Sequence, residues 1–232
     1  SDEVNYALTT YYVKSIDRLG LLGKLEEDGS FGVHTHTVDA RLVSRDLLDS
    51  IVEIYFLEKN LALSSIQGLR MLDIGAGYGR LASRAARVFD NLTEYVCTDA
   101  VPESTYISDY YLQHRGVQCK TNVVPLDEIE VYLKRNAVHV AVNIHSFSEC
   151  SIEAIRWWLD LLASNRVPYL MIVPNAVEHG GERLELNNGQ DFSNLVKECG
   201  YELMVRSPKF MDPVVQRYGI SPTWHYLFKL SV

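Results

Sequence analysis

Short apolar runs alternate with helical patterns over most of the chain, from Gly68 to its last residues. Runs of Val, Ile, Leu and Tyr are typical of buried strands, and apolar residues at every third or fourth position are typical of helices that cover a sheet. The predicted strands are residues 70–74, 94–98, 120–124, 138–144, 169–173, 202–207 and 224–230. The predicted helices are residues 78–89, 104–115, 127–135, 151–163 and 192–199. This alternation predicts an α/β fold with a mostly parallel sheet of seven strands.

The first 67 residues have a different pattern and predict a helical cap. Residues 5–22 have helical spacing, and residues 44–61 carry a stronger apolar stripe with Ser44 as a candidate N-cap. Residues 28–41, between these helices, predict a loop or a short hairpin. We therefore expect an N-terminal extension, residues 1–67, attached to a sheet domain, residues 68–232.

Charge and composition exclude two classes of partner. The 232 residues carry a net charge of −8, whereas a general nucleic-acid binder needs clustered Lys and Arg. No apolar run approaches the roughly 20 residues that span a bilayer, and the N-terminus lacks the pattern of a signal peptide. The four cysteines form no Cys-x-x-Cys pair, so we expect reduced thiols in a cytoplasmic protein. The sequence leaves open whether the protein forms a homodimer.

A glycine-rich turn follows the first predicted strand of the sheet domain. The turn reads Gly75-Ala76-Gly77-Tyr78-Gly79, with glycine at every second position, whereas dinucleotide-binding turns usually read Gly-x-Gly-x-x-Gly. Asp73 stands two residues before the first glycine. A carboxylate there disfavours a pyrophosphate and favours an ammonium group.

Asp99 ends the next predicted strand, where an acid can accept hydrogen bonds from both hydroxyls of a ribose, or can simply cap the following helix. Asp73 and the glycine turn together resemble motif I of the class I S-adenosylmethionine (SAM) methyltransferases, and Asp99 adds a candidate ribose contact. The resemblance implies a Rossmann-like class I methyltransferase fold with SAM as cofactor. The cofactor-binding residues that it implies are Asp73, Gly75, Ala76, Gly77, Tyr78, Gly79, Asp99, Ala100, Pro125, Leu126 and Asn143.

The segment Asn143–Cys150, NIHSFSEC, closes the fourth strand, whose carboxyl end faces the transferred methyl group in this fold. His145 titrates near neutral pH and is therefore our candidate general base, with a buried structural histidine as the alternative. Glu149 could orient His145, bind a metal or start the next helix. With the glycine turn, this segment resembles the sugar O-methyltransferases, in particular those of the mycobacterial mannoside type.

The acceptor site is predicted from scattered polar and aromatic residues. Glu178 and His179 follow the fifth strand, where Glu178 with Glu149 could also hold Mg²⁺ or could be a solvated loop charge. The His-x-His pair from the cap could line the acceptor pocket, although it is no zinc site. The predicted substrate-binding residues are His34, His36, Glu178, His179, Tyr218 and Trp224.

These features predict a SAM-dependent O-methyltransferase that acts on a hydroxyl of a small saccharide or oligosaccharide. A phenolic or carboxylate acceptor stays open, as does a non-catalytic SAM-fold subunit. A nicotinamide-dependent oxidoreductase is disfavoured, because the chain lacks both the longer glycine spacing and a catalytic Tyr-x-x-x-Lys.

Overall fold

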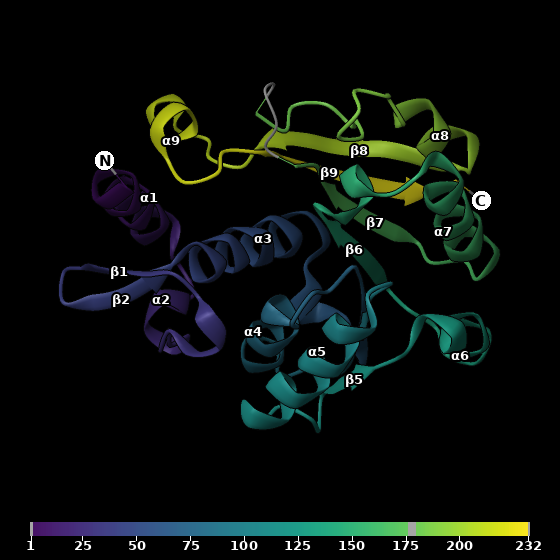
Figure 1. Ribbon diagram of the computed structural model, residues 1–232, viewed down its shortest axis with the longest axis horizontal. Coiled ribbons are helices and arrows are strands. Elements are labelled where there is room, and N and C mark those ends of the chain that lie inside the picture. Colours follow the sequence, from purple (N-terminus) through teal and green to yellow (C-terminus); the bar gives the residue numbers. More distant parts are fainter. Residues whose placement is uncertain (1, 176–179, 232) are drawn as a thin grey trace.

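One seven-stranded sheet organises the computed structural model, which describes residues 2–175 and 180–231 (Figure 1). Its strands lie in the order β5-β4-β3-β6-β7-β9-β8. Every neighbouring pair is parallel except the two pairs that contain β9, which runs antiparallel to β7 and to β8. The predicted seven-stranded, mostly parallel sheet is therefore confirmed. The strands are β3 (Leu69–Ile74), β4 (Leu92–Thr98), β5 (Thr121–Val123), β6 (Val140–Ile144), β7 (Tyr169–Val173), β8 (Tyr201–Pro208) and β9 (Trp224–Leu230).

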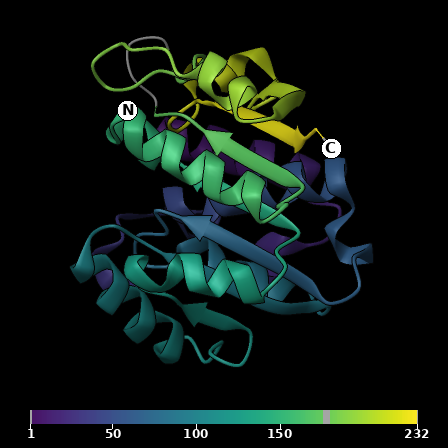
Figure 2. The same ribbon diagram turned by 90° about the vertical axis from the view of Figure 1, so that its right-hand side faces the viewer.

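Helices cover both faces of this sheet, and each face has its own apolar cluster. Figures 1 and 2 show α3 and α7 on opposite faces. On one face lie α3 (Arg45–Leu61), α4 (Arg80–Val88) and α5 (Pro102–His114). On the other face lie α6 (Ile129–Arg135), α7 (Ile152–Ser164) and α8 (Ser193–Glu198). The crossovers therefore bury the sheet between two helical layers, as parallel strands require.

Helix α3 is the most deeply buried part of the N-terminal region. Ser44 caps it by accepting a hydrogen bond from the Leu47 N–H at 2.9 Å, which confirms the predicted start of this helix. Eleven of its residues are buried, among them the predicted apolar stripe from Leu47 to Tyr55. Its apolar residues belong to the same cluster as those of β3 and α4. Residues from both predicted regions therefore share one core.

The prediction of one helix over residues 5–22 is wrong. Helix α1 (Asp2–Ile16) ends earlier, and a separate short helix, α2 (Leu21–Lys24), follows it. Asp17 accepts hydrogen bonds from the N–H groups of Leu21 and Leu22, and Gly20 has a φ of +66°. The left-handed glycine redirects the chain and the aspartate starts a new helix, so the helical spacing continues across a break.

Residues 28–41 contribute to a hairpin, the second of the two forms that the sequence predicts. Strands β1 (Thr35–Val38) and β2 (Arg41–Ser44) pair antiparallel around a two-residue turn. Both turn residues, Asp39 and Ala40, have positive φ, as the right-handed twist of a tight hairpin favours. Short 3₁₀ turns occupy Ser30–Gly32, Leu63–Ser65, Leu126–Glu128 and Ser146–Glu149.

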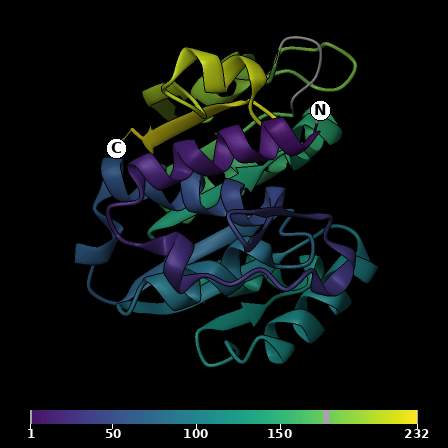
Figure 3. The ribbon, with the colours of Figure 1, turned by 90° about the vertical axis from the view of Figure 1, so that its left-hand side faces the viewer.

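The connection between β8 and β9 contains a helix that is not among the predicted helices, α9 (Pro213–Tyr218). Asp212 caps it by accepting hydrogen bonds from Val214 and Val215, and proline fills its first position. Helix α1 lies beside α9 (Figure 3), where Thr9 Oγ1 accepts a hydrogen bond from the Ile220 N–H at 3.0 Å. Across the described ranges, no helix has the length and apolarity that crossing a membrane demands.

Candidate functional site

The glycine turn between β3 and α4 has the backbone that only glycine adopts easily. Gly75, Gly77 and Gly79 have φ values of +74°, +57° and +86°. A Cβ at Gly75 would lie 2.2 Å from Ser146 Oγ, so packing against the 3₁₀ turn that follows β6 excludes any side chain there. A Cβ at Gly77 would meet no protein atom within 4 Å. Protein atoms therefore fill the space next to Gly75, whereas the space next to Gly77 is open and a ligand can approach the backbone there.

Asp99 connects this turn to the end of β4. Its Oδ2 accepts a hydrogen bond from the Gly77 N–H and its Oδ1 accepts one from the Val101 N–H, both at 2.9 Å. A carboxylate has about four acceptor sites, so both oxygens keep a lone pair for further donors. Asp99 can therefore shape the turn and still accept hydrogen bonds from the hydroxyls of a ribose.

Asp73 is a buried acid with one hydrogen bond to a side chain. Only 4% of its surface is exposed, and its Oδ2 accepts a hydrogen bond from the Tyr95 hydroxyl at 3.1 Å. Burial raises the pKa of Asp73 to about 7, against the opposing effects of Arg80 and of the Tyr95 hydrogen bond. A cationic group brought next to this carboxyl would favour its ionised form. The site therefore fits the ammonium group of an amino acid such as that of SAM.

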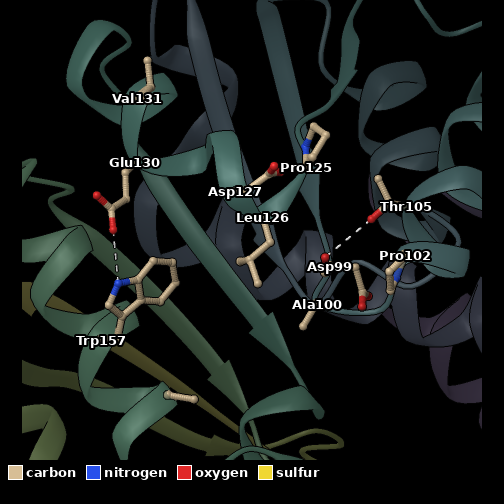
Figure 4. A pocket seen from close by; sticks show the side chains of 11 residues that line it. Asp99, Ala100, Pro102, Thr105, Pro125, Leu126, Asp127, Glu130, Val131 and Trp157 are labelled. Atoms are coloured by element: carbon tan, nitrogen blue, oxygen red, sulfur yellow. Dashed lines mark hydrogen bonds between the residues drawn. The ribbon is translucent and has the colours of Figure 1, made fainter.

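A larger pocket of about 740 Å³ lies beside Asp99 (Figure 4). Asp99 and Ala100 form one side of it, Trp157 and Glu130 form the other, and Leu126 lies between them. The predicted cofactor residues Asp99, Ala100, Pro125 and Leu126 all line it. Its largely apolar walls fit a flat base such as adenine.

The structure places the indole of Trp157 in the wall of this pocket. Its Nε1 donates a hydrogen bond to Glu130 Oε1 at 3.3 Å. The neighbouring Trp158 is 7% exposed and belongs to the core. Trp158 lies three residues after Ile155 and four before Leu162, so it shares their buried face of α7. Trp157 does not have this spacing, and the sequence pattern therefore distinguishes the two tryptophans.

His145 lies at the end of β6 and lines a second pocket, about 170 Å³, with Asp73 and the glycine turn. Its backbone has a φ of +70° and a ψ of −34°, an uncommon conformation for a residue with a side chain. A hydrogen bond from its N–H to the Val173 carbonyl, 2.7 Å long, holds this conformation. Burial lowers the pKa of His145, and Arg80 lowers it further. The imidazole is therefore neutral at pH 7 and able to accept a proton.

The acidic neighbours of His145 come from α3, which the sequence pattern did not bring to the site. Glu53 is 2% exposed and binds Arg80 through both carboxylate oxygens, at 2.8 and 2.9 Å. One helical turn earlier, Asp49 pairs with Lys209, whose ammonium also donates to two backbone carbonyls. These acids and Arg80 act on the pKa of His145. Three side chains at helical spacing, Asp46, Asp49 and Glu53, were the signal in the sequence.

Three other predicted residues have clear partners within the protein. Asn143 is fully buried and its amide binds the Ile74 carbonyl, Ser146 Oγ and the Phe147 N–H, so it supports the turn from below. Tyr78 lines the pocket beside His145, and its hydroxyl donates to Asp46. Glu149 is exposed and accepts a hydrogen bond from Asn175 Nδ2 at 3.2 Å. The proposed contacts of these residues with a cofactor or with His145 stay predictions.

The predicted acceptor residues fall in separate places. His34 lines a pocket of about 370 Å³ with Tyr6, Phe31, Arg45 and Tyr78, and His36 packs between Tyr6 and His34. This pocket shares Arg45, Asp46 and Tyr78 with the pocket of His145.

The remaining predicted acceptor residues lie elsewhere. Tyr218 is exposed on α9, and the Arg206 guanidinium lies 4.3 Å from the centre of the Trp224 ring. Neither of them lines the pockets of His34 and His145. Glu178 and His179 lie outside the described residues. Among residues 2–175 and 180–231, no three His, Cys, Asp or Glu side chains group closely enough to hold a metal ion.

Comparisons with known proteins give a fold and no closer relative. No family model and no curated protein matches the sequence. Solved structures do match. The [4+2]-cyclase SpnF has a TM-score of 0.58 and 16% identity, with 98% of this chain and 97% of that one covered.

Two methyltransferases have similar scores. The mitomycin 7-O-methyltransferase MmcR has a TM-score of 0.53 and 16% identity, covering 81% and 57% of the two chains. The precorrin-6y C5,15-methyltransferase from Geobacter metallireducens has a TM-score of 0.52 and 12% identity, covering 88% and 96%. The sheet order, the antiparallel β9 and these matches together show that the chain has the Rossmann-like fold of the class I methyltransferases.

Proposed function

We propose that this protein is a SAM-dependent O-methyltransferase that acts on a hydroxyl of a saccharide. One observation carries the proposal: Asp73, the glycine turn and His145 line the same pocket. A carboxylate for an ammonium group, an open backbone for a cofactor and a neutral base for a hydroxyl therefore meet within one small space.

The described residues offer a place for each part of SAM. Asp73 would hold the ammonium group, Asp99 the ribose, and the pocket beside Leu126 and Trp157 the adenine. When bound, SAM supplies an activated methyl group on a sulfonium, which is already a good leaving group. The protein must therefore align the acceptor and remove its proton. Alignment can contribute roughly 7–11 kcal/mol, and a positioned base about 10²–10⁴-fold.

His145 is the proposed base. It lies at the carboxyl end of β6 beside the turn, and its lowered pKa keeps it unprotonated at neutral pH. Ionised Glu53 and Asp49 favour the imidazolium that forms when His145 accepts a proton. They thus oppose the burial that keeps the resting imidazole neutral, and they stabilise the charge that proton transfer creates.

Support for a saccharide comes from the adjoining pocket of His34. Its lining combines aromatic rings, Tyr6 and Phe31, with a guanidinium and a carboxylate, Arg45 and Asp46. Aromatic faces pack against the C–H surface of a sugar ring, and charged side chains bind its hydroxyls. A phenolic acceptor would use the rings equally well, so the acceptor panel in the experiment below includes one.

Calorimetric titration with S-adenosylhomocysteine tests the cofactor half of the proposal. Wild type should bind, Asp73→Ala should bind at least tenfold more weakly, and the exposed control Asp90→Ala should bind like wild type. Absence of binding by wild type, or undiminished binding by Asp73→Ala, would falsify the proposal. Binding alone does not distinguish a methyltransferase from a protein that uses the fold for other chemistry, such as the cyclase SpnF, so methyl transfer is measured separately.

Transfer of a labelled methyl group to saccharide and phenol acceptors tests the other half, with EDTA and added Mg²⁺ as separate conditions. His145→Ala should keep cofactor binding and lose about 10²–10⁴-fold in turnover. The exposed Gln118→Ala is the control and should remain fully active. Full activity of His145→Ala would assign the base to another residue, and transfer to phenols alone would exclude the saccharide.

A further inference from the structure

Another cavity, about 260 Å³, lies away from the glycine turn, between α1, α3 and the end of β8. It shares no lining residue with the pocket of His145 or with the pocket of Trp157. The proposed methyl transfer leaves it unused. Its volume suits a small ligand of one or two fused rings.

The walls of this cavity are apolar and aromatic. Helix α3 contributes Val52, Tyr55 and Phe56, and α1 contributes Tyr12 and Ile16. The hydroxyl of Tyr55 donates a hydrogen bond to Asp17 and is therefore already satisfied. The body of a ligand here would meet mainly carbon atoms.

The charged side chains that line the cavity are all cationic: Arg18, Lys59 and Lys209. Arg18 and Lys59 are exposed at its mouth, and within the described part of the chain neither forms an ion pair. Lys209 is buried and bound to Asp49. Three cations around one apolar cavity stand out on a chain whose net charge is −8.

His225 forms part of the same wall. It is 2% exposed, packs edge-on against Phe56 with ring centroids 5.0 Å apart, and has no hydrogen bond from its imidazole to any described residue. Burial, and then Lys209, lower the pKa of His225 to about 3. The neutral imidazole therefore has one N–H to offer to a ligand.

We infer that this cavity is a second binding site, separate from the methyl-transfer site, and that it takes a small aromatic carboxylate. The ring of the ligand occupies the space between Tyr55 and Phe56, and its carboxylate faces Arg18 and Lys59. The inference stands on this cavity alone and does not require the proposed methyl transfer.

Fluorescence titration with 2-naphthoate tests the inference, with the neutral 2-naphthamide as the matched probe. Naphthoate should bind at least fivefold more tightly than the amide. The double variant Arg18→Gln/Lys59→Gln should weaken naphthoate binding by about five- to tenfold, and the exposed control Lys24→Gln should leave it unchanged. Ser207→Phe, which fills the cavity from β8, should abolish binding.

Titration of the same variants with S-adenosylhomocysteine distinguishes the two sites. It should be unchanged in the double variant and in Ser207→Phe, which also shows that both variants fold. Asp73→Ala should bind naphthoate like wild type. Equal binding of acid and amide, an unchanged affinity in both cavity variants, or displacement of naphthoate by S-adenosylhomocysteine would each overturn the inference.

Discussion

Individual residues of the glycine turn have different tasks. Gly75 is required by the protein, since a Cβ there would collide with Ser146. Gly77 faces open space, so no protein atom excludes a side chain there. Its lack of a side chain instead leaves room for a ligand that approaches the turn from solvent. The two glycines are equivalent in sequence and distinct in the structure.

Replacing Gly77 by alanine should separate these tasks. The left-handed backbone costs an alanine roughly 1–2 kcal/mol, so the variant should fold with slightly lower stability. Its affinity for S-adenosylhomocysteine should fall at least tenfold, because the methyl group occupies the path of the ligand. Gly116→Ala, with a φ of +68° and no neighbour within 4 Å, is the matched control. It should show the same loss of stability and unchanged affinity; equal affinities in both variants would argue against a ligand at Gly77.

Asp73 should make the stability of the ligand-free protein fall as pH rises. Its pKa is about 7 in the folded protein and near 3.8 when unperturbed, so the folded state binds the proton more tightly. The resulting stabilisation is complete below pH 3.8 and is lost as pH rises through 7. Asp73→Asn stays neutral at every pH and lacks this loss. The free energy of unfolding of the variant minus that of wild type should therefore grow by up to about 4 kcal/mol between pH 4 and pH 8.

Urea denaturation at four pH values measures this difference, because other titrating groups contribute equally to both proteins. A difference that stays constant with pH would mean that Asp73 is ionised in the folded protein at all pH values tested.

At the scale of elements, α3 combines two faces. One carries the apolar residues of the shared core, and the other carries Asp46, Asp49 and Glu53 toward the carboxyl ends of the strands. The second face binds Tyr78, Lys209 and Arg80, which come from the glycine turn, the β8–β9 connection and α4. Helix α3 therefore positions three separate segments around His145.

A double-mutant cycle on the buried Glu53–Arg80 pair should measure how strongly α3 and α4 depend on each other. Glu53→Leu leaves the Arg80 guanidinium without its carboxylate and should lower the free energy of unfolding by about 3–5 kcal/mol. The double variant Glu53→Leu/Arg80→Leu removes both charges and should be more stable than the single one. Chemical denaturation of wild type, Glu53→Leu, Arg80→Leu and the double variant provides the coupling energy. Additive losses would show that the two side chains do not depend on each other.

At the scale of the whole molecule, the N-terminal region and the sheet share a core. The apolar residues of α3 and α4 belong to one cluster with those of β3, and α1 is bound to the β8–β9 connection through Tyr12 and Thr9. Each fully buried aliphatic or phenylalanine side chain contributes about 1.5–3 kcal/mol. The sum over α3 is as large as the net stability of a typical domain, about 5–15 kcal/mol.

The fragment 68–232 should therefore fail to fold alone, although it contains every strand of the large sheet. We expect a fragment that binds a hydrophobic dye and shows no cooperative thermal transition, whereas the full chain melts in one step. A fragment starting at residue 44, which keeps α3 and its N-cap, should recover a cooperative transition at lower temperature. Cooperative unfolding of 68–232 would instead show that the sheet region folds without α3.

The sequence by itself determined the alternation of strands and helices, the start of α3 at Ser44 and the position of the glycine turn between β3 and α4. These features depend on neighbours a few residues apart, so they are legible in a linear pattern. It did not separate α1 from α2 or reveal α9, because single turn residues and caps decide those boundaries.

Only the tertiary structure decided which distant groups surround His145. The acids of α3 and Lys209 reach it through packing between segments as much as 160 residues apart, and burial then sets its pKa. Packing likewise placed Trp157 in the pocket wall and separated the two glycines by their surroundings. Local pattern fixes which residues are available, whereas long-range contacts and solvent exclusion decide what each of them can do.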